Sequence, residues 1–366
     1  MRNLSTLAWR VYDAPTKPWH GVVADTEGDD SVYVMRVERR DGVSQLTLAH
    51  ITPTGTEELA VLEVASAPPH VPDVADFRLL ADGGSSVNHM PAICVIGSGG
   101  DIVLMPVDEE ASAPAEVVGS VDQGILAAAW SPEEDVLVLI TGGEKRLIVM
   151  TREFEVMSET MLSTEAFGDD QPVNVGWGSK STQFHGSEGK QAAMAAANAP
   201  EESDPRGPLV PEDDGLPRIS WRGDGAFFVT SSAEASHDTV HRILRTYTRT
   251  GTLSATSDRS VRGISHVLAC RPTGNLIATT QRMGGPWAPG RHGRHDVVFF
   301  ERNGLRHGEF SLREEHGSVP DVPGVSAEPL PPWSCEHQIR LVSWNADGSV
   351  LAVVLQRAGL HVLQQI

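Results

Sequence analysis

The stretch GWGSKSTQFHGSEGK, residues 176–190, gathers residue types that phosphate-binding and nucleophilic sites use. A P-loop needs G-x-x-x-x-G-K-[ST], in which glycine directly precedes the lysine so that backbone amides can wrap the phosphates. Here Ser179 stands between Gly178 and Lys180, and no helical pattern follows. The hypothesis of a nucleotide site therefore fails on spacing.

The end of the same stretch, SEGK, matches the Ser-x-x-Lys pattern of acyl-transfer nucleophiles. That chemistry needs Lys190 one helical turn from Ser187, and the intervening Gly189 disfavours a helix. No Ser-Asp-Asn, Lys-Thr-Gly or G-x-S-x-G motif accompanies it. We therefore predict no catalytic residue, no cofactor and no enzyme. The alternative is a propeller enzyme with a site in its central channel, but the chain lacks a series of acids or histidines at equivalent repeat positions.

Two groups of histidines have the residue types of metal ligands: His237 with His241, and His292 with His295 and Asp296. Their spacing is loose, no cysteine lies nearby, and both groups fall in stretches expected to be long polar loops. We interpret them as solvated surface residues and predict no metal site.

A locally basic stretch lies at residues 291–307, where the chain carries four arginines: Arg291, Arg294, Arg302 and Arg306. We favour charge balance on an acidic surface as its role. The alternative is an auxiliary contact to RNA or to an acidic partner.

Composition limits the classes of partner and compartment. The chain has 366 residues, 49 acidic and 29 basic side chains, and a formal net charge of −20, so it is a poor candidate for binding nucleic acid alone. Its three cysteines, Cys94, Cys270 and Cys335, lie far apart and suit a reducing compartment. No apolar run is long enough for a membrane helix, and no signal peptide is recognisable. We expect a cytoplasmic protein, with a nuclear location as an alternative.

An internal repeat organises the chain. Four segments share one pattern: 125–156, 217–256, 265–310 and 339–366. Each begins with a short apolar strand, continues through a polar turn (SPEED, RGDG, RPTG or NADG), and enters a second strand rich in apolar and β-branched residues. The first strands end at Trp130, Trp221, Cys270 and Trp344. Weaker copies lie upstream at 31–51 and 92–107.

These short strands and tight turns predict an all-β fold, a WD40-like β-propeller of about seven blades in one domain over 1–366. The spacing also fits six blades. The last blade is either complete or lacks one strand. Two β-sandwich domains are the other fold considered. Long insertions are expected at 191–217, 284–296 and 316–333, of which the acidic, proline-rich 191–217 is predicted to be disordered. Residues 173–177 are then an inner strand with Trp177 in the repeated aromatic position.

The blocks GWGSKSTQFHGSEGK (176–190) and FFERNGLRHGEF (299–310), with the repeats around them, closely resemble the N-terminal propeller of the Elongator complex protein 1 family. The resemblance implies a non-catalytic scaffold that supports modification of wobble uridines (U34) of tRNA. Its implied partners are the catalytic radical-SAM/acetyltransferase subunit and a second propeller subunit, with tRNA contacted indirectly or weakly and no membrane. A candidate interaction loop then comprises Lys180, Gln183, Phe184, His185 and Lys190.

Two departures from the family pattern restrict what can be transferred. Family members are much longer and carry a second propeller, a helical repeat region, a dimerisation region and a basic tRNA-contacting segment, none of which is in this sequence. Cys270 also fills a repeat position that is tryptophan in the other three clear copies, so we expect looser packing in that blade.

Overall fold

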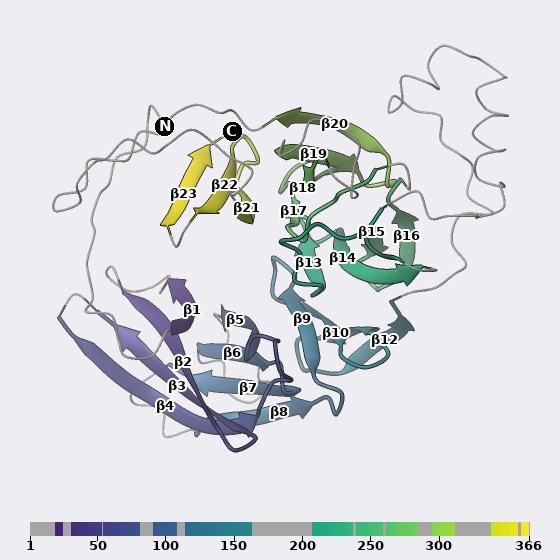
Figure 1. Ribbon diagram of the computed structural model, residues 1–366. Coiled ribbons are helices and arrows are strands. Elements are labelled where there is room, and N and C mark those ends of the chain that lie inside the picture. Colours follow the sequence, from purple (N-terminus) through teal and green to yellow (C-terminus); the bar gives the residue numbers. More distant parts are fainter. Residues whose placement is uncertain are drawn as a thin grey trace, which may run out of the picture. The chain divides into compact units, whose positions relative to one another are not determined.

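A computed structural model describes residues 19–24, 31–52, 54–80, 91–107, 114–162, 207–236, 239–258, 261–284, 295–311, 338–357 and 360–365. All regular structure in these ranges is β-strand (Figure 1). None of the described segments is a helix long and apolar enough to cross a membrane. The chain divides into two compact units, Arg2–Ser163 (the N-terminal unit) and Thr164–Ile366 (the C-terminal unit).

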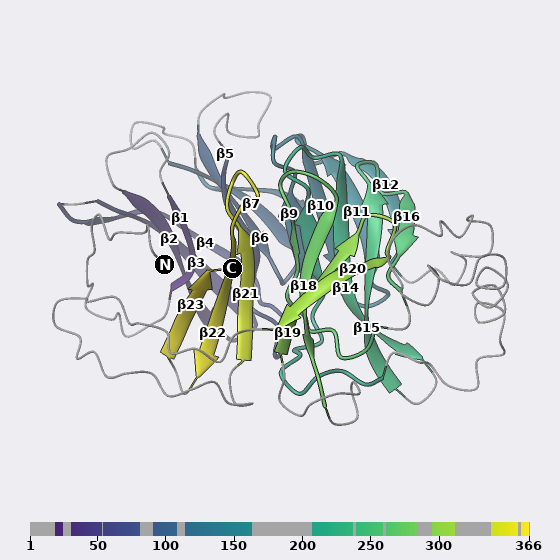
Figure 2. The same cartoon turned by 90° about the horizontal axis from the view of Figure 1, so that it is seen from above.

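The N-terminal unit contains three four-stranded antiparallel sheets. The first runs β1 (Trp19–Ala24), β2 (Val32–Arg40), β3 (Val43–Ile51), β4 (Thr56–Ala65). The second runs β5 (Val74–Leu80), β6 (Ala92–Gly97), β7 (Asp101–Pro106), β8 (Glu116–Ser120). The third runs β9 (Ile125–Trp130), β10 (Val136–Thr141), β11 (Arg146–Thr151), β12 (Val156–Met161), a fan of consecutive strands in Figure 2.

The C-terminal unit contains two four-stranded sheets and one three-stranded sheet. These are β13 (Arg218–Trp221), β14 (Phe227–Ser236), β15 (Thr239–Thr248), β16 (Leu253–Thr256); then β17 (Ala269–Cys270), β18 (Leu276–Arg282), β19 (His295–Glu301), β20 (Arg306–Ser311); and β21 (Gln338–Trp344), β22 (Leu351–Arg357), β23 (Leu360–Gln365). The first strand of each sheet contacts the first strand of the next, β13 with β17 and β17 with β21 (Figure 1).

The repeated turn has the same hydrogen bonds in all four clear copies. The amide of the residue after the first strand donates to a carbonyl five residues later, as in Ser131 to Val136 at 2.8 Å and Asn345 to Val350 at 2.9 Å. Residues 222 and 271 do the same, at 3.0 and 2.8 Å. Gly348 has φ +69°, which glycine adopts at little cost. The polar turns of the sequence therefore produce one local structure.

Sheets in each unit stack through buried aliphatic and aromatic side chains. Between the second and third sheets, Ile96, Leu137 and Leu139 are fully buried and pack with Trp130. In the C-terminal unit, Phe227 and Phe300 share one cluster with other buried residues of the first two sheets. Central strands such as β6 and β10 are apolar and buried along their whole length, because side chains on both faces of a propeller sheet pack against other sheets.

The all-β, WD40-like β-propeller class predicted from the repeats is confirmed. The described residues supply six sheets, and residues 173–177, the expected further inner strand, lie outside the described ranges. So do most of the insertions expected at 191–217, 284–296 and 316–333. The strands β1, β4, β5, β8 and β12 were not predicted, because they are short or carry many polar residues.

Candidate functional site

The candidate interaction loop from the sequence lies outside the described residues. This concerns Lys180, Gln183, Phe184, His185 and Lys190. Trp177, assigned to the repeated aromatic position, also lies outside them. The role of this loop stays a prediction.

The basic stretch at 291–307 is described only from residue 295 onward, so Arg291 and Arg294 are outside. Arg302 is exposed, and its Cζ lies 5.1 Å from the centroid of the Phe227 ring. Arg306 instead pairs with Glu309 at 2.9 Å. The two described arginines therefore differ, since Glu309 already balances the charge of Arg306.

The repeated positions at the ends of the first strands all lie against a neighbouring strand. Trp130, Trp221 and Cys270 are buried, with 3%, 9% and 6% of their surface exposed, and Trp344 is partly buried. The Trp344 indole donates a hydrogen bond to the carbonyl of Ala269 at 3.3 Å. Cys270 belongs to a buried cluster, and its backbone amide donates a hydrogen bond to the Ser220 hydroxyl oxygen at 2.9 Å.

Of the two histidine groups, His237 and His292 lie outside the described residues. His241 is a buried residue of β15, and Asp296 is a fully buried residue of β19. The expectation that both groups sit in solvated loops is wrong for these two residues. The reason is that β15 and β19 include these polar positions together with the apolar residues that follow them, Ile243 and Leu244 in β15 and VVFF in β19.

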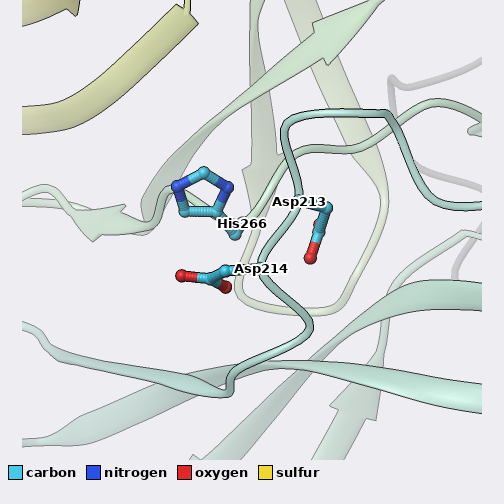
Figure 3. A group of neighbouring side chains, drawn as sticks. All are labelled: Asp213, Asp214 and His266. Atoms are coloured by element: carbon cyan, nitrogen blue, oxygen red, sulfur yellow. The ribbon is translucent and has the colours of Figure 1, made fainter. Parts of the chain in front are cut away.

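Side chains able to do chemistry gather at another place, on the C-terminal unit. Asp213, Asp214 and His266 have ligand-type atoms within 4.8 Å of one another. The two aspartates come from the segment that leads into β13, and His266 comes from the connection between β16 and β17. Figure 3 shows the two carboxylates pointing in different directions from one loop, with His266 entering from a separate segment.

Asp213 is held by a buried arginine. The side chains of Arg242, on β15, and Asp213 are both 0% exposed. Arg242 Nε donates to Asp213 Oδ2 at 2.6 Å, and Nη2 donates to Oδ1 at 2.5 Å. The remaining Nη1 donates to the carbonyls of Leu216 and Ser231, each at 3.2 Å. Paired, planar geometry of this kind is the strongest that arginine forms with a carboxylate.

The neighbouring acids are paired in the same way. Arg218 donates a short hydrogen bond to the Asp214 carboxylate. Glu212, only 3% exposed, accepts from Arg282 at 2.5 Å. Three consecutive acidic residues of the sequence thus meet three arginines from three different strands.

Burial and charge set the protonation states of the cluster. Burial works against ionisation of Asp214, but the Arg218 guanidinium and the Leu216 amide outweigh it and hold the pKa of Asp214 below its usual value. Burial also lowers the pKa of His266, against the attraction of Asp214 and Asp213. At neutral pH Asp214 is therefore charged and His266 is neutral.

These residues do not fit a cation site. A divalent cation would need the oxygens that already accept hydrogen bonds from Arg242 and Arg218, and it would lie next to two guanidinium charges. The arrangement instead fastens the segment 207–217 onto the sheets, because its acidic side chains can be buried only with these arginines.

Residues 207–217 therefore differ from the expectation of a disordered insertion. Val210 is buried, and the amide of Leu209 donates to the carbonyl of Val240 at 2.9 Å. Residues 191–206 lie outside the described ranges. The signal that could have indicated this packing is Arg242, one of two arginines in the β-strand sequence HRILRTYT, because a charge on a central strand needs a partner.

Among the described carboxyl groups of the N-terminal unit, that of Asp76 has a shifted pKa. Burial raises the pKa of Asp76, on β5, to about 6, against the lowering effects of the Phe77 amide and of Arg78. The nearby Cys94 thiol is buried, and burial raises its pKa far above the ordinary range. A thiol that stays protonated is a poor nucleophile, so the pair does not form a catalytic dyad.

Comparisons with known proteins identify relatives of the whole chain. The family model described as "ELP1 first N-terminal beta-propeller" matches residues 1–364. The chain is 33% identical to Elongator complex protein 1 of Mus musculus over 97% of its own length and 23% of that protein. It is 35% identical to Elongator complex protein 1 of Schizosaccharomyces pombe over 72% of its length and 18% of that protein. The chain spans less than a quarter of these relatives.

A solved structure with a similar fold is Sqt1 of Chaetomium thermophilum, determined bound to the N-terminus of the ribosomal protein L10. The TM-score is 0.51 at 14% identity, with 97% of this chain and 73% of that chain covered. At that identity the likeness concerns the fold alone.

Proposed function

Because the chain belongs to the Elongator complex protein 1 family, whose first N-terminal β-propeller model it matches over residues 1–364, we propose that it is a non-catalytic scaffold of the Elongator complex. In this role it organises the catalytic subunit and a second propeller subunit, and so supports modification of the wobble uridine (U34) of tRNA. The match along the chain is the observation that carries the proposal.

The chemistry of the described residues supports a scaffold. The acidic cluster on the C-terminal unit is neutralised by its own arginines, and the shifted carboxyl group of Asp76 lies beside a protonated thiol. An enzyme site would need an activated nucleophile or an available acid-base pair next to a substrate. Here the strongest charge interactions hold the fold together.

The proposed partners are the radical-SAM/acetyltransferase subunit and the second propeller subunit, in the cytoplasm, with tRNA contacted indirectly or weakly. We propose that the loop containing Lys180, Gln183, Phe184, His185 and Lys190 contributes to these contacts, on the basis of its resemblance to the family.

Co-purification tests the proposal. Tagged chain 1–366 is co-expressed with the two partner subunits, next to a full-length family member as the positive control. We expect the chain to retain at least one of them. Failure of the folded chain to bind either, under conditions in which the full-length protein binds, would refute the scaffold role.

The loop is tested separately with Lys180→Ala combined with His185→Ala. Weaker association with an unchanged thermal unfolding curve is expected. Undiminished association would remove the loop from the interface and leave the scaffold role intact.

A further inference from the structure

Four arginines lie at one edge of the C-terminal unit. Arg222 follows β13, Arg249 follows β15, Arg271 follows β17 and Arg302 follows β19. In an antiparallel sheet, alternate strands end at the same edge, so the two arginines of each sheet share an edge. We call these four residues the arginine edge.

Contacts between the sheets make this edge continuous. The turn containing Gly223 packs against the turn containing Pro272, where a Cβ added to the glycine would lie 2.8 Å from the proline Cα. Arg271 Nε donates to the carbonyl of Gly348 at 2.8 Å, and the Thr273 hydroxyl donates to the carbonyl of Asp347 at 3.3 Å. The arginine edge therefore runs from the first sheet of the unit to the third.

Aromatic rings hold three of the guanidinium groups in place. Arg222 and Arg302 both lie over the ring of Phe227, at 5.7 and 5.1 Å from its centroid to Cζ. Arg271 lies over the ring of Trp344 at 5.6 Å. Stacked arginines lose little further freedom when they bind a carboxylate or a phosphate, because the ring already restricts the side chain.

The positive charge at this edge is only partly balanced by described carboxylates, and Asp347 lies near enough to Arg271 for their charges to attract each other. Arg222 has Asp224 as a partner at 3.1 Å. No described carboxylate lies within ion-pair distance of Arg271 or Arg302, although the whole chain has a net charge of −20. Two like charges over one ring repel each other, and an anionic ligand would relieve that repulsion.

We propose that the arginine edge binds an acidic peptide segment of a partner protein, with carboxylates received by Arg271 and Arg302. Exposed aspartates separate the arginines: Asp224 is 50% exposed, and Asp347 is kept ionised by hydrogen bonds from Ser349 that lower its pKa. An RNA strand carries a phosphate at every nucleotide and would bring some of them against these aspartates. A peptide can place neutral residues there, so the charge pattern favours a peptide.

This proposal goes beyond the scaffold role, and its test uses the chain alone. The probe is a short fluorescent peptide with aspartate at every third position in a glycine-serine background, and its binding to chain 1–366 is followed by fluorescence anisotropy. The matched peptide with asparagine in place of aspartate, and an oligouridine of similar length, are the comparison ligands. We expect the aspartate peptide to bind best and its affinity to fall as salt is raised.

Variants locate the binding site. R271Q combined with R302Q should weaken binding of the aspartate peptide about tenfold or more, because each change removes a charge-assisted hydrogen-bond donor. R262Q is the matched control, since Arg262 is exposed and lies beside Gln281, near the opposite end of β18. R271K combined with R302K preserves the positive charge at both positions. Thermal unfolding of this variant and of the glutamine variant checks that both remain folded. Three outcomes would overturn the proposal: equal binding of the aspartate and asparagine peptides, tighter binding of oligouridine, or an equal loss in R262Q.

Discussion

The ion pair between Arg242 and Asp213 offers the sharpest test of how the structure is held together. Replacing Arg242 with methionine keeps most of the volume but leaves the Asp213 carboxylate buried, with one remaining donor, the amide of Gly215 at 2.8 Å. Removing one partner of a buried pair costs about 3–5 kcal/mol, because the other charge is left without compensation. Asp213→Leu should cost a similar amount, because it leaves the Arg242 guanidinium buried without its carboxylate.

Urea unfolding followed by tryptophan fluorescence measures this loss as a change in the unfolding free energy. Hydrogen exchange at the amides of Gly215 and Leu216 should speed up in both single variants, since these amides belong to the fastened segment. The double variant R242M/D213L removes both charges and should recover most of the lost stability. R146Q, which breaks exposed ion pairs on the other unit, should leave the curve nearly unchanged.

The result that would refute this reasoning is a loss below about 1 kcal/mol in both single variants, the range of an ordinary exposed pair. A double variant as unstable as the two single losses added together would also refute it, because independent sites add and a coupled pair does not.

Further predictions concern the pH dependence, the packing and the thiols. The pKa of Asp76 is raised from 3.8 to about 6, so its stabilising contribution is complete below pH 3.8 and is lost as the pH rises through 6. In Asp76→Asn the midpoint of urea unfolding should therefore no longer depend on pH over this window. The variant should also be more stable than the unchanged chain at pH 7.5, by roughly 3 kcal/mol or less. Gly99→Ala would place a Cβ 2.0 Å from a backbone carbonyl oxygen at the end of β4 and should lower the free energy of unfolding by about 1–3 kcal/mol. Gly308→Ala is the matched control, because the space around that position is open and thermal unfolding should show no such loss. Cys94 and Cys270 should resist iodoacetamide in the native chain and react after denaturation, as peptide mapping by mass spectrometry would show; rapid native labelling would contradict their burial and their raised pKa values.

Much of the fold could be predicted from local sequence. The turns SPEED, RGDG, RPTG and NADG each close the same hydrogen-bonded loop, since small polar residues and a residue with positive φ suffice for it. The strands after these turns were predicted because apolar residues run through them. Edge strands such as β12, with the sequence VMSETM and mostly exposed side chains, carry no such pattern and were missed.

The acidic cluster could not be predicted, because its parts come from distant positions. Read locally, the residues PEDDG at 211–215 have the composition of a disordered loop. Only the folded sheets bring Arg242, Arg218 and Arg282 beside them, and the paired charges then make burial of this segment favourable.

The sequence by itself therefore determined the repeat, the all-β class and the family, since these depend on short-range order of residue types. The tertiary structure decided which charges are neutralised inside the chain and which, as at Arg271 and Arg302, stay available for a partner. The physical reason is that charge pairing depends on distance in space and on burial, and both are set by how strands far apart in the sequence pack together.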